Sequence, residues 1–283
     1  MSTIKPPTIT DHKKGEDYTK ITFQPDLQRF GLDCITDDME ALMCKRIYDL
    51  AGVLPGVKVF LNDERLKIKN FKEYIEMYLK SSAAASAGGE GALAPAPEKI
   101  PIVHQIVSPR WEIAFAMSDG QFQQVSFVNS ICTSKGGTHV DHVTKQITDK
   151  LLEMIMAKQK KNSKMDLKPA QIKNHMWVFI NCLIENPAFD SQTKENMTLK
   201  QSSFGSKCEV TGDFINKITR QTPILETVQS WARFKQDQAL KKSDGTRRSR
   251  ISGILKLEDA NDAGTKNGKC KSLFLCWLTS PKS

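Results

Sequence analysis

The sequence predicts an α+β fold, because runs typical of β-strands and stripes typical of amphipathic helices both occur along its 283 residues. The clearest strand covers residues 176–184, where β-branched and aromatic residues follow one another closely. The clearest helix follows Gly136 and Gly137, and its apolar residues recur at helical spacing. Hydrophobic residues make up 39% of the chain, which suffices for ordinary cores, and the length predicts about two domains.

The first elements are a tail, a strand and a helix. Residues 1–14 are polar and contain prolines, so we expect a disordered tail. Residues 18–23 alternate between apolar and polar side chains as a strand does. Asp37 or Asp38 can cap a helix that ends at Gly52. The apolar face of this helix would consist of Met39, Leu42, Met43, Ile47 and Leu50.

A hairpin and a second helix come next. Residues 57–61 and 65–68 are two short strands with a turn at Asn62 and Asp63. Asn70 begins a helix as its cap, with Glu73 as the partner in a capping box. Its inward face would be Phe71, Tyr74, Ile75, Tyr78 and Leu79, which we interpret as packing.

A low-complexity segment at 81–98 separates these elements from the next group. Its alanines, serines, glycines and prolines bury too little apolar area to offset the entropy lost on ordering, so we expect a flexible insertion. Strands are then predicted at 111–117 and 122–129, joined in hairpin fashion at 118–120.

The long helix after the two glycines would place Val140, Val143, Ile147, Leu151 and Ile155 inward. It ends in a lysine-rich segment at 158–164, and a short helix from Pro169 leads back to the strand at 176–184. Two further helices are predicted at 213–220 and 224–240.

A polar loop begins where the strand at 176–184 ends. Gln192, Thr193 and Lys194 therefore follow a buried strand directly, and a lysine ammonium on its long stem can reach a phosphate from outside the main pocket of a site. A solvated loop without a ligand is the alternative interpretation.

Charge and cysteine usage narrow the class of protein. The net charge of +9 favours a polyanionic partner, and the excess lies in two stretches. Residues 145–173 hold eight lysines against three acidic residues, and residues 235–256 hold seven basic residues against two acidic ones. The seven cysteines lie far apart, which favours free thiols in a reducing compartment. No apolar run is long enough for a membrane span, so we expect no membrane partner.

Four strings resemble, in order and spacing, segments of eukaryotic type II DNA topoisomerases. The first is Asn-Pro-Ala-Phe-Asp-Ser-Gln-Thr-Lys-Glu-Asn-Met-Thr-Leu at 186–199, and the second is Gln-Ser-Ser-Phe-Gly-Ser-Lys-Cys at 201–208. The third is Phe-Val-Asn-Ser-Ile-Cys-Thr-Ser-Lys-Gly-Gly-Thr-His-Val at 127–140, and the fourth is Gly-Ile-Leu-Lys-Leu-Glu-Asp-Ala-Asn-Asp-Ala-Gly at 253–264. The resemblance extends from Gly15 to Lys269.

The resemblance implies a domain plan. Residues 15–80 would be the C-terminal part of a GHKL (Bergerat) ATPase domain, a sheet-and-helix layer. Residues 99–252 would be a transducer domain with a left-handed βαβ-type sheet, helices on one face and a long C-terminal helix. Residues 253–283 would be a truncated connection toward an absent TOPRIM domain, because the family's sequence gives way to Lys-Ser-Leu-Phe-Leu-Cys-Trp-Leu at 271–278. Leu255 stands where the family has proline.

The resemblance also implies ligands and roles. Gln192, Thr193 and Lys194 would contact the γ-phosphate of ATP, and Lys158, Lys160, Lys161 and Lys164 would contact double-stranded DNA without reading its sequence. A solvated basic turn is the alternative for the four lysines. The whole family uses ATP and Mg²⁺, forms homodimers in the nucleus and changes DNA topology by ATP-driven double-strand passage.

Several catalytic motifs of the family have no counterpart in this sequence, among them the magnesium ligands and the cleavage tyrosine. We therefore expect a fragment that is inactive alone, and a non-catalytic DNA- or partner-binding module derived from the transducer is the alternative. His139 and His142 have a spacing that can hold a metal, but no third ligand is apparent, and we interpret them as hydrogen-bonded residues.

Overall fold

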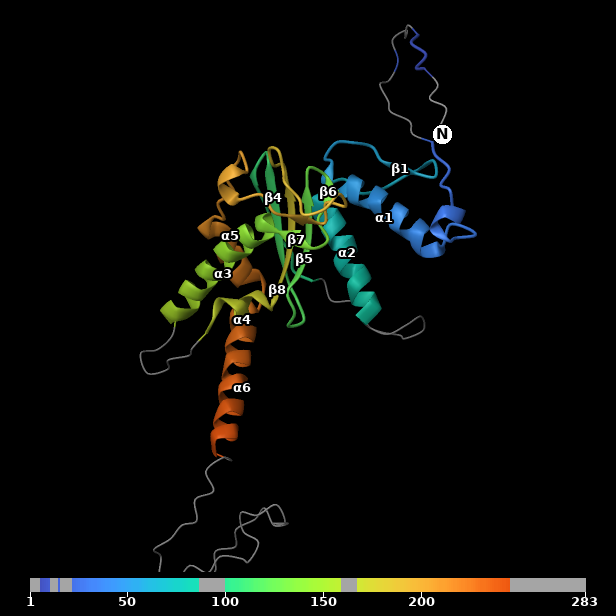
Figure 1. Ribbon diagram of the computed structural model, residues 1–283. Helices are drawn as coiled ribbons and strands as arrows, with labels where there is room; N and C mark the ends of the chain where they lie inside the picture. Colours follow the sequence, from blue (N-terminus) through green and yellow to red (C-terminus); the bar gives the residue numbers. More distant parts are fainter. Residues whose placement is uncertain (1–5, 11–14, 16–21, 87–99, 159–166, 245–283) are drawn as a thin grey trace, which may run out of the picture.

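A five-stranded mixed sheet forms the centre of the protein, whose computed structural model describes residues 6–10, 15, 22–86, 100–158 and 167–244 (Figure 1). The strand order is β3-β4-β8-β5-β6. The strands are β3 (Val103–Ser108), β4 (Trp111–Met117), β5 (Gln123–Val128), β6 (Ile131–Cys132) and β8 (Met176–Cys182).

The central strand is β8, which lies between β4 and β5. It runs antiparallel to β4, from Trp111 opposite Cys182 to Met117 opposite Met176, and parallel to β5. The predicted hairpin between the strands at 111–117 and 122–129 is therefore wrong. The hairpin partner of β4 is β3, which the sequence analysis missed. A strand that is apolar on both sides gains most from the centre of the sheet, so β8 separates β4 from β5.

The connection from β5 to β8 passes through α3 (Thr138–Lys158) and α4 (Pro169–Lys173), so these elements form a βαβ unit. With α5 (Gly212–Gln221) and α6 (Ile224–Asp244), these helices cover one face of the sheet. The predicted inward stripe of α3 is confirmed, since Val140, Val143, Ile147, Leu151 and Ile155 are all buried.

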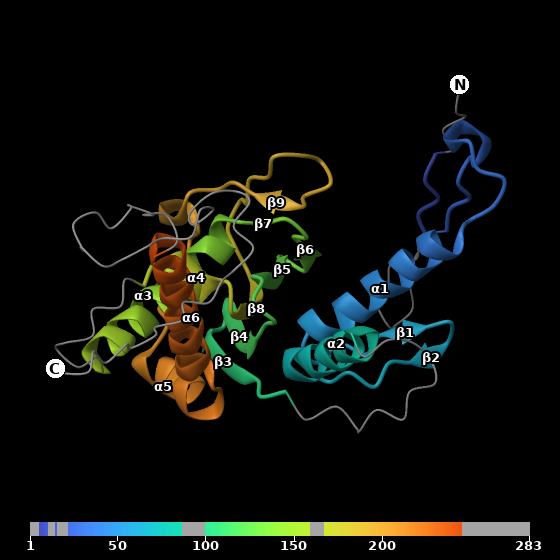
Figure 2. The same ribbon diagram turned by 90° about the horizontal axis from the view of Figure 1, so that it is seen from below.

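Helices N-terminal to residue 99 cover the opposite face (Figure 2), whereas the described helices within 99–252, the predicted transducer, lie on one face as predicted. Alternate side chains of β4 and β8 enter two separate cores. Val178 faces the α3 side, whereas Trp177 and Phe179 pack with Phe71 of α2 (Phe71–Ser86). The near-continuous apolar sequence of β8 is the pattern that burial on both faces requires.

Helix α1 (Asp37–Val53) packs against α2 through its C-terminal turns. Its cap is Thr36, whose hydroxyl accepts a hydrogen bond from the Met39 amide at 3.4 Å, and not Asp37 or Asp38. The predicted apolar face is also wrong, because Leu42 is 55% exposed and Met43 is 44% exposed. The buried positions are Asp49, Ala51, Gly52 and Val53.

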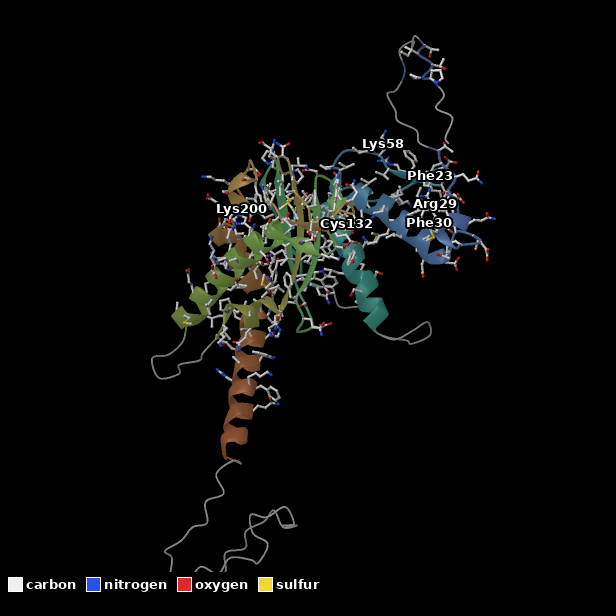
Figure 3. The ribbon with its side chains drawn as sticks, viewed as in Figure 1. Phe23, Arg29, Phe30, Lys58, Cys132 and Lys200 are labelled. Carbon is white, nitrogen blue, oxygen red and sulfur yellow. The ribbon has the colours of Figure 1, made fainter. Side chains whose placement is uncertain are left out.

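Gly52 permits this packing. A Cβ atom at Gly52 would lie 2.6 Å from Cγ of Tyr74, so only glycine allows α1 and α2 to approach so closely. The helix continues one residue beyond Gly52, which therefore does not end it. Phe23 and Phe30 project near the other end of α1 and are largely exposed (Figure 3).

The remaining N-terminal predictions are partly met. The hairpin is present as β1 (Phe60–Leu61) and β2 (Glu64–Arg65), with Asn62 and Asp63 at positive φ. Asn70 caps α2, since its side chain accepts a hydrogen bond from the Glu73 amide at 2.9 Å. Thr22 and Phe23 are not in a strand, and residues 18–21 lie outside the described part.

Helix α2 runs on through Ser86, into the segment 81–98 predicted as a flexible insertion. Alanine is the strongest helix former, which explains why the helix continues. Residues 87–98 and 253–283 lie outside the described residues. Within the described ranges, no helix is long and apolar enough to cross a membrane.

Candidate functional site

The polar loop after β8 is closed at its base by backbone contacts. Phe189 forms an antiparallel bridge with Met197, and the Thr198 amide donates to the Ala188 carbonyl at 2.9 Å. The Asp190 amide donates to the Asn196 carbonyl oxygen at 3.3 Å. Residues 191–195 lie beyond these contacts and therefore form the tip of the loop.

A tight turn forms that tip. The Lys194 amide donates to the Ser191 carbonyl at 3.1 Å, and the hydroxyls of Ser191 and Thr193 lie 2.8 Å apart. Lys194 has a φ of +59°, a left-handed conformation that is uncommon for a residue with a side chain. Gln192 and Thr193 are exposed, so the turn presents all three predicted residues from one short segment.

The Lys194 ammonium forms no ion pair with any residue that the structure describes. Its Nζ atom lies 6.0 Å from the centroid of the Phe189 ring. The neighbouring carboxylates have other partners. Glu195 forms an ion pair with Lys135 at an N–O distance of 2.6 Å. The Asp190 carboxylate accepts a hydrogen bond from the Asn196 side chain at 3.0 Å.

These contacts shift two pKa values. The hydrogen bond from Asn196 lowers the pKa of Asp190, and the contact with Glu195 raises the pKa of Lys135. Both groups are therefore charged at neutral pH. The Lys194 ammonium remains available to an external anion, since the nearby carboxylates are already engaged.

Two short strands that the sequence analysis missed hold the loop against the body of the protein. β7 (Gly136–Gly137) pairs in parallel with β9 (Asn196–Met197), and the Lys135 amide donates to the Glu195 carbonyl at 3.0 Å (Figure 2). Gly137 has a φ of +136°, and a Cβ atom there would lie 2.3 Å from the Met197 carbonyl oxygen. The glycine pair therefore does more than turn the chain into α3, because it admits the loop backbone.

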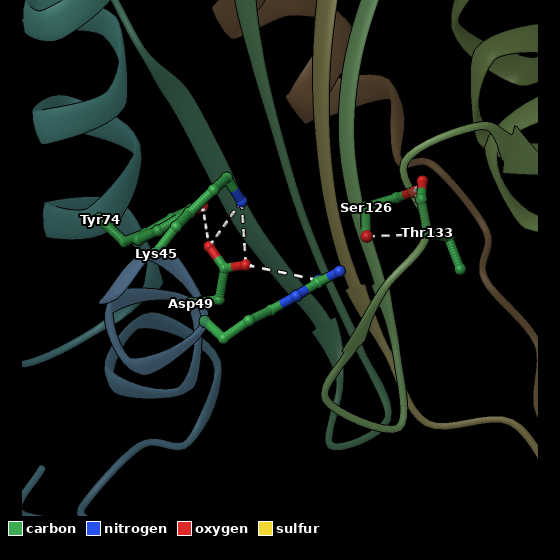
Figure 4. Close-up of polar contacts among 6 residues, drawn as sticks. Lys45, Asp49, Tyr74, Ser126 and Thr133 are labelled. Carbon is green, nitrogen blue, oxygen red and sulfur yellow. Dashed lines mark hydrogen bonds and ion pairs between the residues drawn. The ribbon is translucent and has the colours of Figure 1, made fainter. Parts of the chain in front are cut away.

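A buried polar cluster supports β7 from behind. The Ser126 and Thr133 hydroxyl oxygens lie 2.5 Å apart, and the Thr133 hydroxyl donates to the Ser126 carbonyl at 3.0 Å (Figure 4). His139 Nε2 lies 3.1 Å from the Thr133 hydroxyl oxygen. His139 Nδ1 has no hydrogen-bond partner among the described residues, so the tautomer with its proton on Nε2 leaves no buried N–H group unpaired, and in this tautomer Nε2 donates to Thr133.

The His139 side chain is therefore a neutral imidazole with a bare Nδ1. Nδ1 has no partner among the described residues, and burial lowers the pKa of His139 from 6.5 to about 4, with Asp141 acting weakly in the opposite direction. His142 instead contacts the Cys208 carbonyl at 2.9 Å. The two histidines thus act in hydrogen bonding, as interpreted from the sequence.

The described residues contain no group of three His, Cys, Asp or Glu side chains that could hold a metal ion.

Helix α3 runs from the loop's anchor toward the predicted lysine cluster. At its start, Thr138 donates to the Leu199 carbonyl at 2.5 Å, and further along Gln146 bonds to Cys208 and Val210. The helix ends at Lys158. The Lys158 side chain, and Lys160, Lys161 and Lys164, lie outside the described residues.

Comparison with known proteins identifies relatives over most of the chain. The family model for DNA gyrase B matches residues 70–247. DNA topoisomerase 2 of Candida glabrata is 51% identical over 272 residues, which are 95% of this chain and 19% of that protein. DNA topoisomerase 2 of Drosophila melanogaster is 49% identical over 269 residues, 95% of this chain and 18% of that protein. The chain thus spans about a fifth of the length of these relatives.

Solved structures agree. The ATPase region of Saccharomyces cerevisiae topoisomerase II aligns with a TM-score of 0.62 and 44% identity, covering 74% of this chain and 49% of that one. The ATPase and transducer domains of the enzyme from Balamuthia mandrillaris align with a TM-score of 0.65 and 38% identity, covering 75% of this chain and 49% of that one. The predicted fold class is thereby confirmed. The chain belongs to the DNA gyrase B family, and its resemblance to eukaryotic type II DNA topoisomerases is confirmed.

Proposed function

We propose that this chain is the ATPase and transducer part of a type II DNA topoisomerase, an isomerase that changes DNA topology by ATP-driven double-strand passage. In this proposal the loop tip at 191–195 senses the γ-phosphate of ATP. The observation that carries it is the Lys194 ammonium, which has no ion pair within the described residues although its loop is pinned to the sheet.

The geometry suits a sensor better than a binding pocket. Three side chains on one turn, Gln192, Thr193 and Lys194, can supply one cation and two neutral hydrogen-bonding groups to a terminal phosphate. They form no enclosed site for a base or a sugar. Most of the affinity for ATP would therefore come from elsewhere in the ATPase region, and this loop would add contacts that ADP cannot make.

The test uses a chimera that adds the rest of the Saccharomyces cerevisiae ATPase region to this chain. Lys194→Ala should cut ATP hydrolysis by about thirty- to a thousand-fold, the loss of one charge-assisted contact in a shielded site, and leave ADP affinity unchanged. Gln192→Ala should follow more weakly. Lys200→Ala is the matched control, because Lys200 is an exposed lysine beyond β9 (Figure 3). Equal loss of ATP and ADP affinity, or no loss, would show a solvated loop.

We also propose that Lys158, Lys160, Lys161 and Lys164 contact duplex DNA through its phosphates. Support comes from α3, which leads from the loop's anchor to Lys158 and so connects the two predicted sites through one helix. Neutralising about three phosphates gives a slope near −3 for log affinity against log salt concentration, without sequence preference.

Replacing these four lysines with alanine should flatten that slope in filter-binding or anisotropy measurements. An unchanged slope would move the contact elsewhere, with the basic residues at 241–250 as the next candidates. Because DNA would be the substrate, we propose a nuclear location, and we propose homodimers because the resembled family forms them. DNA binding by a chimera that never hydrolyses ATP would instead favour a non-catalytic binding module.

A further inference from the structure

We propose that the cavity between α1, α2 and the sheet binds an uncharged, planar heteroaromatic small molecule. Its volume is about 810 Å³, within the range of small-molecule sites. The walls include Tyr48 of α1, Tyr74 and Tyr78 of α2, and Gln123 and Trp177 of the sheet. This proposal does not depend on the nucleotide-sensing loop and holds whether or not Lys194 contacts ATP.

The aromatic walls hold one another in place. The rings of Tyr78 and Trp177 meet edge to face at 6.0 Å and 85°, and Trp177 stacks on Phe179 at 5.5 Å. Tyr74 and Trp177 are buried, so their ring positions are set by packing. A flat ring entering the cavity therefore meets preformed aromatic surfaces, which favour stacked or edge-to-face contacts.

The polar groups of the cavity set the charge of the ligand. Asp49 is 2% exposed, and Lys45 donates to its two carboxylate oxygens at 3.0 and 2.9 Å (Figure 4). The Tyr74 hydroxyl donates to the same carboxylate at 2.8 Å. Arg46 Nη1 lies 3.9 Å from the same carboxylate but does not line the cavity, so Lys45 and Asp49 are the charged groups of its wall. An added cation would meet Lys45, and an added anion would meet Asp49.

One hydrogen-bond donor remains for the ligand. An ammonium group has three N–H donors, and Asp49 takes two of those on Lys45. The Lys45 side chain is 41% exposed, so its third donor can reach an acceptor in the cavity. The site therefore selects a ring with an acceptor at one edge, such as a ring nitrogen or carbonyl.

A bound ligand would connect helices to the sheet. Ala41, Cys44 and Tyr48 come from α1, whereas Gln123 and Trp177 come from β5 and β8. Binding should raise the melting temperature by mass action, because the site exists only in the folded protein.

Quinoline is a suitable probe, since it is planar, neutral and has one ring-nitrogen acceptor. In an NMR titration of the full chain, the amides of Tyr78, Gln123 and Trp177 should shift together and saturate. For about ten non-hydrogen atoms, a Kd on the order of 1 mM is expected. Three analogues should bind at least several-fold more weakly than quinoline. Naphthalene-1-methanol has no acceptor within the ring, N-methylquinolinium is a cation, and quinoline-2-carboxylate is an anion.

Two variants separate this site from general surface binding. Ala41→Phe and Ser81→Phe fill the cavity from exposed positions on α1 and α2, and each should weaken quinoline binding at least about tenfold. Met43→Phe places the same ring on α1 outside the cavity, so it should leave binding unchanged. Three outcomes would overturn the proposal. They are unchanged affinity in both filling variants, equal NMR shifts around the exposed Phe23 and Phe30, and tighter binding of a charged analogue.

Discussion

The stability of this fold should fall as the pH drops below about 6.5, because His139 is buried as a neutral imidazole. The side chain has no exposed surface and donates from Nε2 to Thr133. Burial lowers the pKa of His139 from 6.5 to about 4. Protonating Nδ1 would create a buried charge with no partner among the described residues.

The size of the effect follows from proton linkage. Between pH 6.5 and 4 the unfolded chain binds a proton that the folded chain does not, so stability decreases as the pH falls through this window. The loss amounts to about 2 kcal/mol at pH 5 and about 3 kcal/mol at pH 4, relative to pH 8. Burial also lowers the pKa of His175, which adds a loss of the same sign.

Urea unfolding at pH 8 and pH 5 isolates the contribution of His139 when the wild type is compared with His139→Gln. The glutamine amide reaches the place of imidazole Nε2 and can donate to Thr133, but it does not titrate. The wild type should lose about 2 kcal/mol more than the variant between the two pH values. Parallel losses in the two proteins would refute the assignment of His139 as a neutral buried group.

Three further substitutions test the packing. Gly137→Ala should lower the free energy of unfolding by about 2–4 kcal/mol and expose the amides of β9 to hydrogen exchange, because the added Cβ would meet a backbone oxygen at 2.3 Å. Gly212→Ala is the control and should be near neutral, because the space around Gly212 is open. Asn70→Ala should lower stability in thermal unfolding by about 1 kcal/mol through the lost cap of α2. Tyr74→Phe should cost about 1–2 kcal/mol in urea unfolding by removing one donor to Asp49.

Elements with a strong local pattern could be predicted from the sequence. The stripe of α3, the strand at β8 and the Asn70 cap each depend on residues close together in the chain. Helix periodicity and capping are local properties, so they survive without knowledge of the rest of the fold.

Strand partners and exposed faces could not be predicted, since both depend on distant residues. The turn after β4 looks like a hairpin turn, but β8 occupies that edge of β4, where its side chains are buried in both cores. The stripe through Leu42 and Met43 is as apolar as those of the buried helices. It stays exposed because α1 meets α2 through its last turns.

The site was predicted in part. Residue types and the resemblance pointed to the turn at Gln192, Thr193 and Lys194, and the structure places these residues on one tight turn. The pairing of β7 with β9 gave no signal, because two-residue strands have no periodicity to detect. The Thr133 and His139 cluster was missed since its members are polar residues whose burial depends on the whole sheet.

The anchors of the loop differ in strength, and the difference determines what can move. The ion pair of Lys135 with Glu195 is exposed and contributes little to stability. The contact of Gly137 with the backbone of the buried Met197 is steric, and the bridge at Phe189 closes the base of the loop independently. A phosphate that attracted Lys135 away from Glu195 would therefore leave β9 in place. The Lys194 backbone would remain fixed relative to the sheet, so little backbone ordering entropy opposes the contact of its ammonium with an anion, and the entropy lost is that of the lysine side chain.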